Sequence, residues 1–100
     1  MFHVPEDGFI KIAGDRIEMW SESEGPWATL TVPGIGDMKK GVFGIKDWSE
    51  NEGVFNWMME HGFIRNTLGF VPSGFVSIRI CEVDVDKMCS WKAKKGCVSS

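Results

Sequence analysis

The chain has few of the residues that usually carry metal or catalytic chemistry. Its 100 residues include three cysteines and two histidines. The cysteines Cys81, Cys89 and Cys97 form no CxxC pair, whereas a zinc site needs three or four Cys or His ligands at recognisable spacings. An odd number of cysteines also gives no complete disulfide framework and favours a reducing, intracellular setting. We therefore expect no metal site, no cofactor and no disulfide framework.

Long apolar runs and an excess of positive charge are also missing. No run approaches the roughly 18 apolar residues that a membrane-spanning helix needs, and no signal peptide precedes the first polar residues. The formal net charge is −3, which argues against electrostatic binding to a nucleic-acid backbone. We therefore expect a soluble, cytoplasmic protein that binds neither a membrane nor nucleic acid.

The rest of the composition predicts one globular domain over residues 1–100. The chain is 43% hydrophobic and 25% charged, as ordinary folded proteins are. At this length a domain buries roughly two-thirds of its unfolded surface and can fold without disulfides or a structural metal. Tyrosine is absent, but there are five tryptophans and seven phenylalanines. Such rings favour buried or interfacial positions, so they serve either the core or a binding face.

Alternating apolar residues predict five strands. The clearest signal is a hairpin around the turn pair Gly14-Asp15, and Gly44 marks a bulge or a close backbone approach. Two segments rich in glycine, 33–41 and 65–74, are predicted to be loops. The predicted strands are 9–13, 16–20, 27–32, 42–47 and 75–83.

Two helices complete the predicted fold. Ser49 and Glu52 have the spacing of a capping box and predict a helix that ends at Gly62. Asp84 or Asp86 predicts the start of a second helix, which Gly96 would end. The order is β-β-β-β-α-β-α. It predicts an α+β fold, an antiparallel β-meander of about four to five strands with two helices packed on the sheet.

Catalytic arrangements are weak in this sequence. A couple of Cys81 as nucleophile and His61 as base would give a small hydrolase, but a buried structural cysteine is far commoner. Acidic pairs occur only at turns and helix starts, and the chain has no P-loop and no GxGxxG motif. We therefore expect no catalytic residues and place the hydrolase third among the functions considered.

Binding to another protein is the leading prediction. Trp20 and Trp27 alternate with the apolar core positions of their strands, and Trp48 precedes the first helix. Exposed tryptophans together are typical of interface anchors, so we expect these three to bind a partner. The structural alternative is that the second helix, with Trp91, covers this face. We expect Trp20→Ala with Trp27→Ala to abolish partner binding without changing the circular dichroism spectrum.

A small-ligand binder is the second hypothesis. Arginines offer charge, neighbouring hydroxyl and amide groups offer hydrogen-bond donors, and a tryptophan offers stacking to a nucleotide or another phosphorylated metabolite. The predicted ligand-binding residues are Arg65, Asn66, Thr67, Ser73 and Arg79.

The sequence thus favours a small, non-catalytic protein that blocks or modulates another protein. The tryptophan face would serve equally well for pairing two copies, so a homodimer is a further hypothesis. Compact chains of this kind often serve phages and other mobile elements as inhibitors of host defence. That origin is a hypothesis from size and type, and no single residue carries it.

Overall fold

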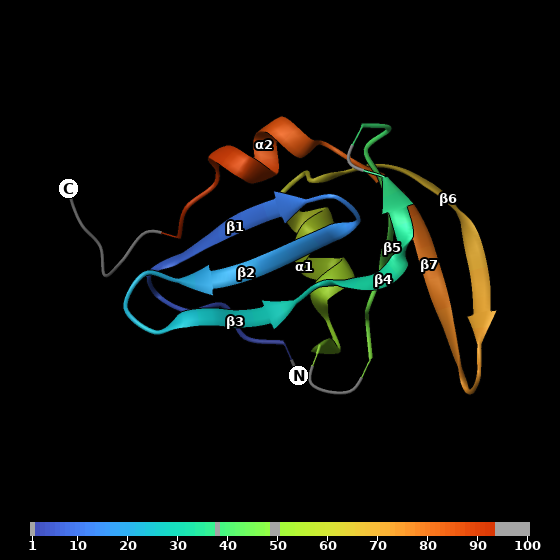
Figure 1. Ribbon diagram of the computed structural model, residues 1–100, viewed down its shortest axis with the longest axis horizontal. Helices are drawn as coiled ribbons and strands as arrows, with labels where there is room; N and C mark the ends of the chain where they lie inside the picture. Colours follow the sequence, from blue (N-terminus) through green and yellow to red (C-terminus); the bar gives the residue numbers. More distant parts are fainter. Residues whose placement is uncertain (1, 38, 49–50, 94–100) are drawn as a thin grey trace.

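The first half of the chain forms a three-stranded antiparallel sheet. The computed structural model describes residues 2–37, 39–48 and 51–93. β1 (Gly8–Ala13), β2 (Arg16–Ser21) and β3 (Gly25–Thr29) pair in the order β1-β2-β3 (Figure 1). The predicted hairpin is confirmed, because Ala13 pairs with Arg16 across the turn and Gly14 has a positive φ of 62°. Only glycine adopts such a φ at no steric cost.

Leu30 is the point where the chain passes from this sheet to the next. Its N–H donates to the Ile17 carbonyl at 2.8 Å, and its own carbonyl accepts from Lys46 N at 2.8 Å. The predicted strand 27–32 is therefore divided in two, with β3 before Leu30 and β4 (Thr31–Asp37) after it. The fully buried Leu30 ties both sheets to one core.

A second sheet has four strands, and it shows that the prediction of two loops was wrong. It has the order β4-β5-β7-β6, with β5 (Val42–Ile45), β6 (Ile64–Ser73) and β7 (Val76–Val83), and every pairing is antiparallel. The predicted loop 33–41 largely belongs to β4, and the predicted loop 65–74 is almost wholly β6. Both strands are irregular, which explains their loop-like composition. β4 has a register shift between Thr31 and Gly36, and β6 has bulges at Arg65 and Leu68.

Two helices complete the fold, and each is shorter than predicted. α1 (Val54–Glu60) begins after Gly53 rather than near Ser49, which lies outside the described residues. Its first turn is capped by Asp47, whose Oδ1 accepts from Gly53 N at 2.9 Å and from Phe55 N at 3.3 Å. The predicted end at Gly62 is confirmed: this residue has a φ of 71°, and its N–H donates to the Met59 carbonyl.

α2 (Val85–Ser90) starts as predicted from Asp84. The Asp84 carboxylate accepts from Lys87 N at 3.0 Å, so Asp84 rather than Asp86 is the cap. The helix ends before Trp91, and the predicted stop at Gly96 lies outside the described residues.

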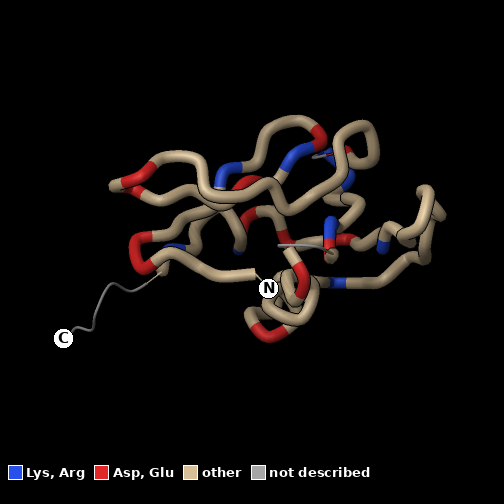
Figure 2. Tube along the Cα trace, turned by 90° about the horizontal axis from the view of Figure 1, so that it is seen from below, with Lys and Arg blue, Asp and Glu red and all other residues tan. Residues whose placement is uncertain are grey.

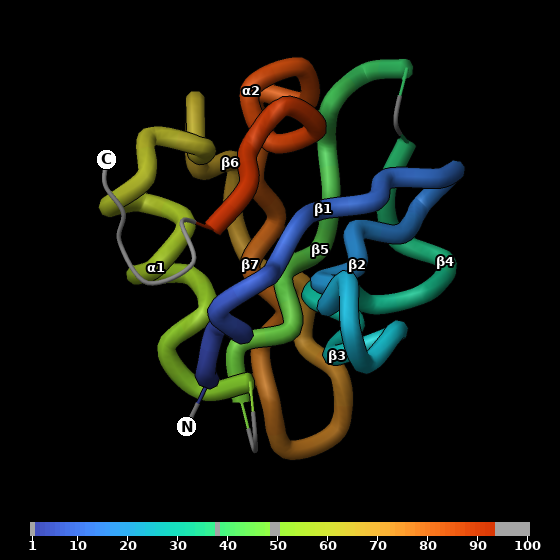
Figure 3. The backbone as a smooth tube through the Cα atoms, turned by 90° about the vertical axis from the view of Figure 1, so that its left-hand side faces the viewer, coloured from blue at the N-terminus to red at the C-terminus, as the bar shows by residue number. Residues whose placement is uncertain are grey.

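The two sheets and both helices share one core. Figure 3 shows the three-stranded sheet in front of the four-stranded one, with α1 at one side and α2 across the top. The predicted α+β class with antiparallel strands and two helices is therefore confirmed. The single meander becomes two sheets, since β4 and β6 add strands that the sequence did not predict. The largest fully buried side chains include Phe43, Phe63, Ile17, Met19, Leu30, Ile45 and Met58.

Candidate functional site

The five tryptophans separate into two groups. Trp57 and Trp91 pack against the buried core, and their ring centroids lie 5.1 Å apart. Among the residues that the structure describes, Trp20, Trp27 and Trp48 lie outside that core cluster. Trp91 therefore does not cover the face of Trp20, as the structural alternative required. We call Trp20, Trp27 and Trp48 the outer tryptophans.

Trp20 is half-buried by its own neighbours on the first sheet. Its Nε1 donates to Glu18 Oε1 at 2.9 Å, and the Lys11 Nζ lies 3.8 Å from the ring centroid. The Phe9 ring is 6.4 Å away on β1. A cation and a carboxylate thus occupy much of this ring, which leaves less of it for a partner.

Trp27 is placed by a bulge. Met19 pairs with Ala28 and Trp20 pairs with Pro26, so Trp27 is the extra residue of β3. A bulge commonly re-aims a side chain. Trp27 is 40% exposed, and its Nε1 donates to the His3 carbonyl at 2.9 Å, which ties the N-terminal segment to the edge of β3.

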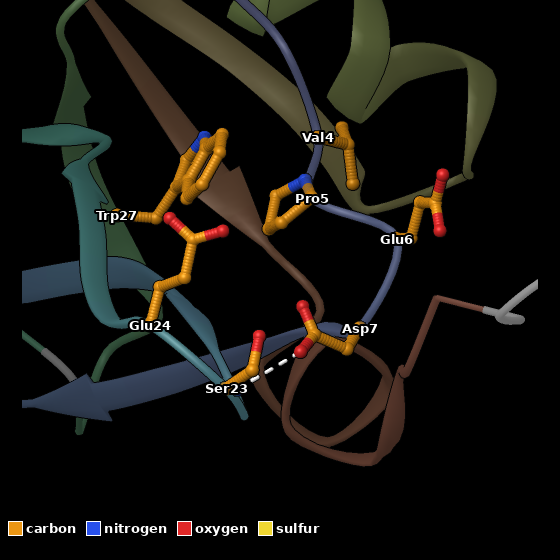
Figure 4. Close-up of a pocket in the computed structure, with 7 residues that line it drawn as sticks. All are labelled: Val4, Pro5, Glu6, Asp7, Ser23, Glu24 and Trp27. Carbon is orange, nitrogen blue, oxygen red and sulfur yellow. Dashed lines mark hydrogen bonds between the residues drawn. The ribbon is translucent and has the colours of Figure 1, made fainter.

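An acidic hollow lies beside Trp27, between the N-terminal segment and the turn after β2 (Figure 4). Its volume is about 380 Å³. Hydrogen bonds from Ser23, and then from Ser21, lower the pKa of Asp7 to about 2, so this carboxylate stays ionised at neutral pH. The hollow therefore attracts cations and repels anions. Its lining residues are Val4, Pro5, Glu6, Asp7, Ser23, Glu24 and Trp27.

Trp48 lines a different hollow with the opposite charge. This second space also measures about 380 Å³ and carries Arg16 and Lys46 in its wall. Trp27 and Trp48 thus belong to separate sites, and the outer tryptophans do not form one continuous face.

The β6–β7 hairpin is the most exposed apolar feature of the described residues. Leu68 is 51% exposed and Phe70 is 59% exposed. Val71 is also exposed, and Phe75, in the two-residue turn, is fully exposed. Figure 1 shows the turn of this hairpin extending at the lower right, beyond the other elements. Sequence reasoning missed this feature because the glycines and the proline of 65–74 suggested a loop.

Most of the hairpin is also free of negative charge, because its only acid, Glu82, lies at the base of β7. Residues 61–81 contain no acid and two arginines, Arg65 and Arg79. The Arg79 guanidinium carbon lies 4.0 Å from the Phe55 ring centroid and 5.0 Å from that of Phe70. In Figure 2 the distal part of the hairpin, at the right, has no red segment. The hairpin thus combines exposed apolar side chains with positive charge.

The structure does not gather the predicted ligand-binding residues into one cavity. Arg65, Asn66, Thr67 and Ser73 are spread along β6, where a rise of about 3.3 Å per residue separates Arg65 from Ser73 by roughly 25 Å. Arg79 is on the neighbouring strand, stacked between two phenylalanine rings. Arg65 lines a small space together with cations and acids in equal number, so its wall has no excess of positive charge; the other charged residues there are Lys39, Lys40, Glu82, Asp84 and Asp86.

The environments of Cys81 and His61 differ from those of a catalytic couple. Burial raises the pKa of the Cys81 thiol, although Arg79 and a hydrogen bond with Thr67 act in the opposite direction. A cysteine nucleophile needs a lowered pKa. The His61 Nδ1 lies 2.9 Å from the Trp57 carbonyl oxygen, and its ring stacks on Phe63 at 5.4 Å. Both residues therefore have a structural explanation.

Within residues 2–37, 39–48 and 51–93, no three His, Cys, Asp or Glu side chains are grouped as a metal site. In the same residues, neither helix has the length and apolar character needed to cross a membrane. Comparisons with protein-family models, with curated proteins and with solved structures give no match.

Proposed function

We propose that the chain is a non-catalytic interaction protein that binds another protein through the β6–β7 hairpin. The observation that carries this proposal is the run of exposed apolar side chains at Leu68, Phe70, Val71 and Phe75. Apolar surface of this kind, gathered on one projecting element, is typical of a protein–protein contact. Aromatic anchors surrounded by less apolar surface usually supply most of the binding free energy.

The backbone of β6 supports the same proposal. β6 is the outer strand of its sheet, so one side of it pairs with no strand among the residues that the structure describes. Pro72 is compatible with this position, because proline is tolerated on edge strands. The bulges at Arg65 and Leu68 interrupt the edge and limit indiscriminate pairing with other strands. Recognition would therefore depend on the side chains, with a partner that offers an apolar groove and acids for the arginines.

The outer tryptophans are a weaker candidate for the binding surface than the hairpin is. Trp20 is occupied by Lys11 and Glu18, and Trp27 is bonded to the N-terminal segment. Blocking or modulating the partner remains part of the proposal, as does a role of the kind that phage inhibitors of host defence play. A small chain whose exposed apolar surface lies mainly on one hairpin suits a protein that acts by occupying another protein's surface.

Affinity capture with matched variants tests this proposal. Wild type and the double variant Phe70→Ser/Phe75→Ser would be immobilised and exposed to a lysate of the source organism. We expect at least one protein to bind wild type and to be lost, by more than ten-fold in quantitative mass spectrometry, from the double variant. Hot-spot aromatics cost about 2 kcal/mol or more when truncated, which corresponds to at least that factor.

Two further variants serve as controls. Met59→Ser removes an apolar side chain on α1 that is 50% exposed, about as much as Leu68, and should retain the partner. Trp20→Ala with Trp27→Ala tests the rival surface. Retention of the same proteins by the hairpin variant, with circular dichroism unchanged in every variant, would show that the hairpin is not the binding surface. Loss of the bound proteins only from the tryptophan variant would show that the binding surface lies on the first sheet.

A further inference from the structure

The hollow beside Trp48 lies where the two sheets meet. We call it the Trp48 hollow. Its volume of about 380 Å³ falls in the range of small-molecule sites, which begins at about 300 Å³. The wall combines an aromatic ring, two cations, two hydroxyl-bearing residues and an apolar side. The lining residues are Arg16, Thr29, Thr31, Val32, Pro33, Lys46 and Trp48.

Two cations line the Trp48 hollow, and the nearby carboxylates of Asp15, Glu18 and Asp47 are held by other groups. Asp15 accepts a hydrogen bond from Gly34 N, and Asp47 caps α1. Glu18 accepts from the Arg16 guanidinium at 3.2 Å and from Trp20 Nε1. No carboxylate lines the hollow itself, and no ion pair of Lys46 is present among the described residues.

Arg16 keeps capacity for a ligand despite its pairing with Glu18. The guanidinium group has five N–H donors, and the contact with Glu18 is made through one nitrogen, Nη1. Its side chain is 56% exposed, so the remaining donors can turn toward the opening. Arg16 and Lys46 together can therefore hold a phosphate or a carboxylate.

The walls are fixed by hydrogen bonds that do not involve a ligand. Lys46 N donates to Leu30 O at 2.8 Å. The buried Thr31 Oγ1 accepts from Ile17 N at 3.1 Å and donates to the Asp15 carbonyl at 3.2 Å. Preorganised walls reduce the ordering cost that binding has to offset.

Asn51 holds the side of the hollow that carries the ring. Its N–H donates to the Trp48 carbonyl at 3.1 Å, and its Nδ2 donates to the Thr29 carbonyl at 2.7 Å. The backbone of Trp48 is thereby tied to the end of β3, with the indole in the wall.

We propose that the Trp48 hollow binds a small planar aromatic anion. The aromatic group would stack on Trp48, while Lys46 and Arg16 would hold its phosphate or carboxylate. Nucleoside monophosphates and aromatic carboxylates share this chemistry. The site goes beyond the proposed protein binding, because it lies on other elements than the hairpin. It also gives the small-ligand hypothesis a different set of residues from Arg65, Asn66, Thr67, Ser73 and Arg79.

Nuclear magnetic resonance titrations of the full chain test the proposal. The probes are adenosine 5′-monophosphate, adenosine, inorganic phosphate and 1-naphthoate. We expect saturable shifts of the Trp48 indole resonance with the nucleotide or the naphthoate, and binding at least ten-fold weaker for adenosine or phosphate alone. Trp48→Ala should weaken binding at least about five-fold, the lower end of what a stacked ring contributes. Lys46→Met should weaken it and reduce its salt dependence.

Lys11 and Trp20 supply the matched control. They form a close cation–ring pair at 3.8 Å but do not line the hollow. Lys11→Met and Trp20→Ala should leave binding unchanged, as should the hairpin variant Phe70→Ser/Phe75→Ser. Binding of the nucleotide but not of the naphthoate would identify phosphate as the anionic group of the ligand. Binding of the naphthoate but not of the nucleotide would identify carboxylate. Absence of saturable shifts with both at millimolar concentration, or equal weakening by the control variants, would overturn the proposal without affecting the hairpin.

Discussion

Asp7 is a half-buried carboxyl that stabilises the turn after β2. Ser21 Oγ donates to its Oδ1 at 2.7 Å, and Ser23 N donates to its Oδ2 at 2.9 Å. These bonds lower its pKa from 3.8 to about 2 in the folded state. A carboxyl with a lowered folded pKa stabilises the fold above its unfolded pKa, and this contribution is lost as the pH falls through the folded pKa.

Asp7→Asn should therefore be less stable than wild type at pH 7, and the difference should shrink between about pH 4 and about pH 2. Urea unfolding midpoints at pH 7, 4 and 2.5 would measure it. Glu6→Gln, which removes the neighbouring carboxylate in the same hollow, serves as the charge control. A difference for Asp7→Asn that is constant across these pH values would show that the ionised form of Asp7 does not stabilise the turn.

At the scale of the secondary-structure elements, two residues compete as the cap of the α1 N-terminus. The sequence pattern favours Ser49 as the cap, whereas the described structure gives this role to Asp47. We expect Asp47→Ala to lower the free energy of unfolding by about 1 kcal/mol, the usual cost of losing a helix cap. Ser49→Ala should cost much less. Chemical denaturation of both variants measures the difference. A larger loss of stability for Ser49→Ala than for Asp47→Ala would show that the predicted capping box, and not Asp47, caps the helix.

The helices, strands and turns also show which sequence signals are sufficient to predict local structure. The Gly14 turn, the Gly62 helix end and the Asp84 cap were predictable because each depends on a few neighbouring residues. Gly44 has neither the bulge nor the close backbone approach that the sequence predicted: a side chain there would instead meet methyl carbons of the Ile78 and Ile35 side chains at 2.8 and 2.9 Å, which come from other strands. β6 was not predictable, because its strand character comes from pairing with β7 and its bulges disrupt the alternation of apolar residues.

The candidate sites followed the same division. The sequence placed Trp27 on the strand face opposite the core positions and named Trp48, just before the first helix, as a further candidate for partner binding. It could not show that they line two hollows of opposite charge, because the lining comes from segments far apart in the chain. Arg16 and Lys46 meet beside Trp48 only because Leu30 joins the two sheets.

For the whole molecule, the uneven distribution of charge has a consequence for self-association. The net charge of the chain is −3, yet residues 61–81 carry two arginines and no acid. Two copies that met tip to tip would bring their two Arg79 side chains near each other, because Arg65 and the only acid of the hairpin, Glu82, both lie at its base. Like charges at close range oppose association at low ionic strength, while the exposed phenylalanines favour it.

We therefore expect the protein to be monomeric at micromolar concentration in low salt. Raising sodium sulfate should increase the dimer fraction, because salt screens the arginines and sulfate strengthens apolar burial. Sedimentation velocity in sodium sulfate at ionic strengths of about 20 mM and about 500 mM measures this, because the Debye length falls from about 20 Å to about 4 Å between them. Phe70→Ser/Phe75→Ser should remove the increase and Met59→Ser should not. A dimer that is strongest at low salt would instead indicate an interface between oppositely charged surfaces, such as the hairpin and the acidic hollow beside Trp27.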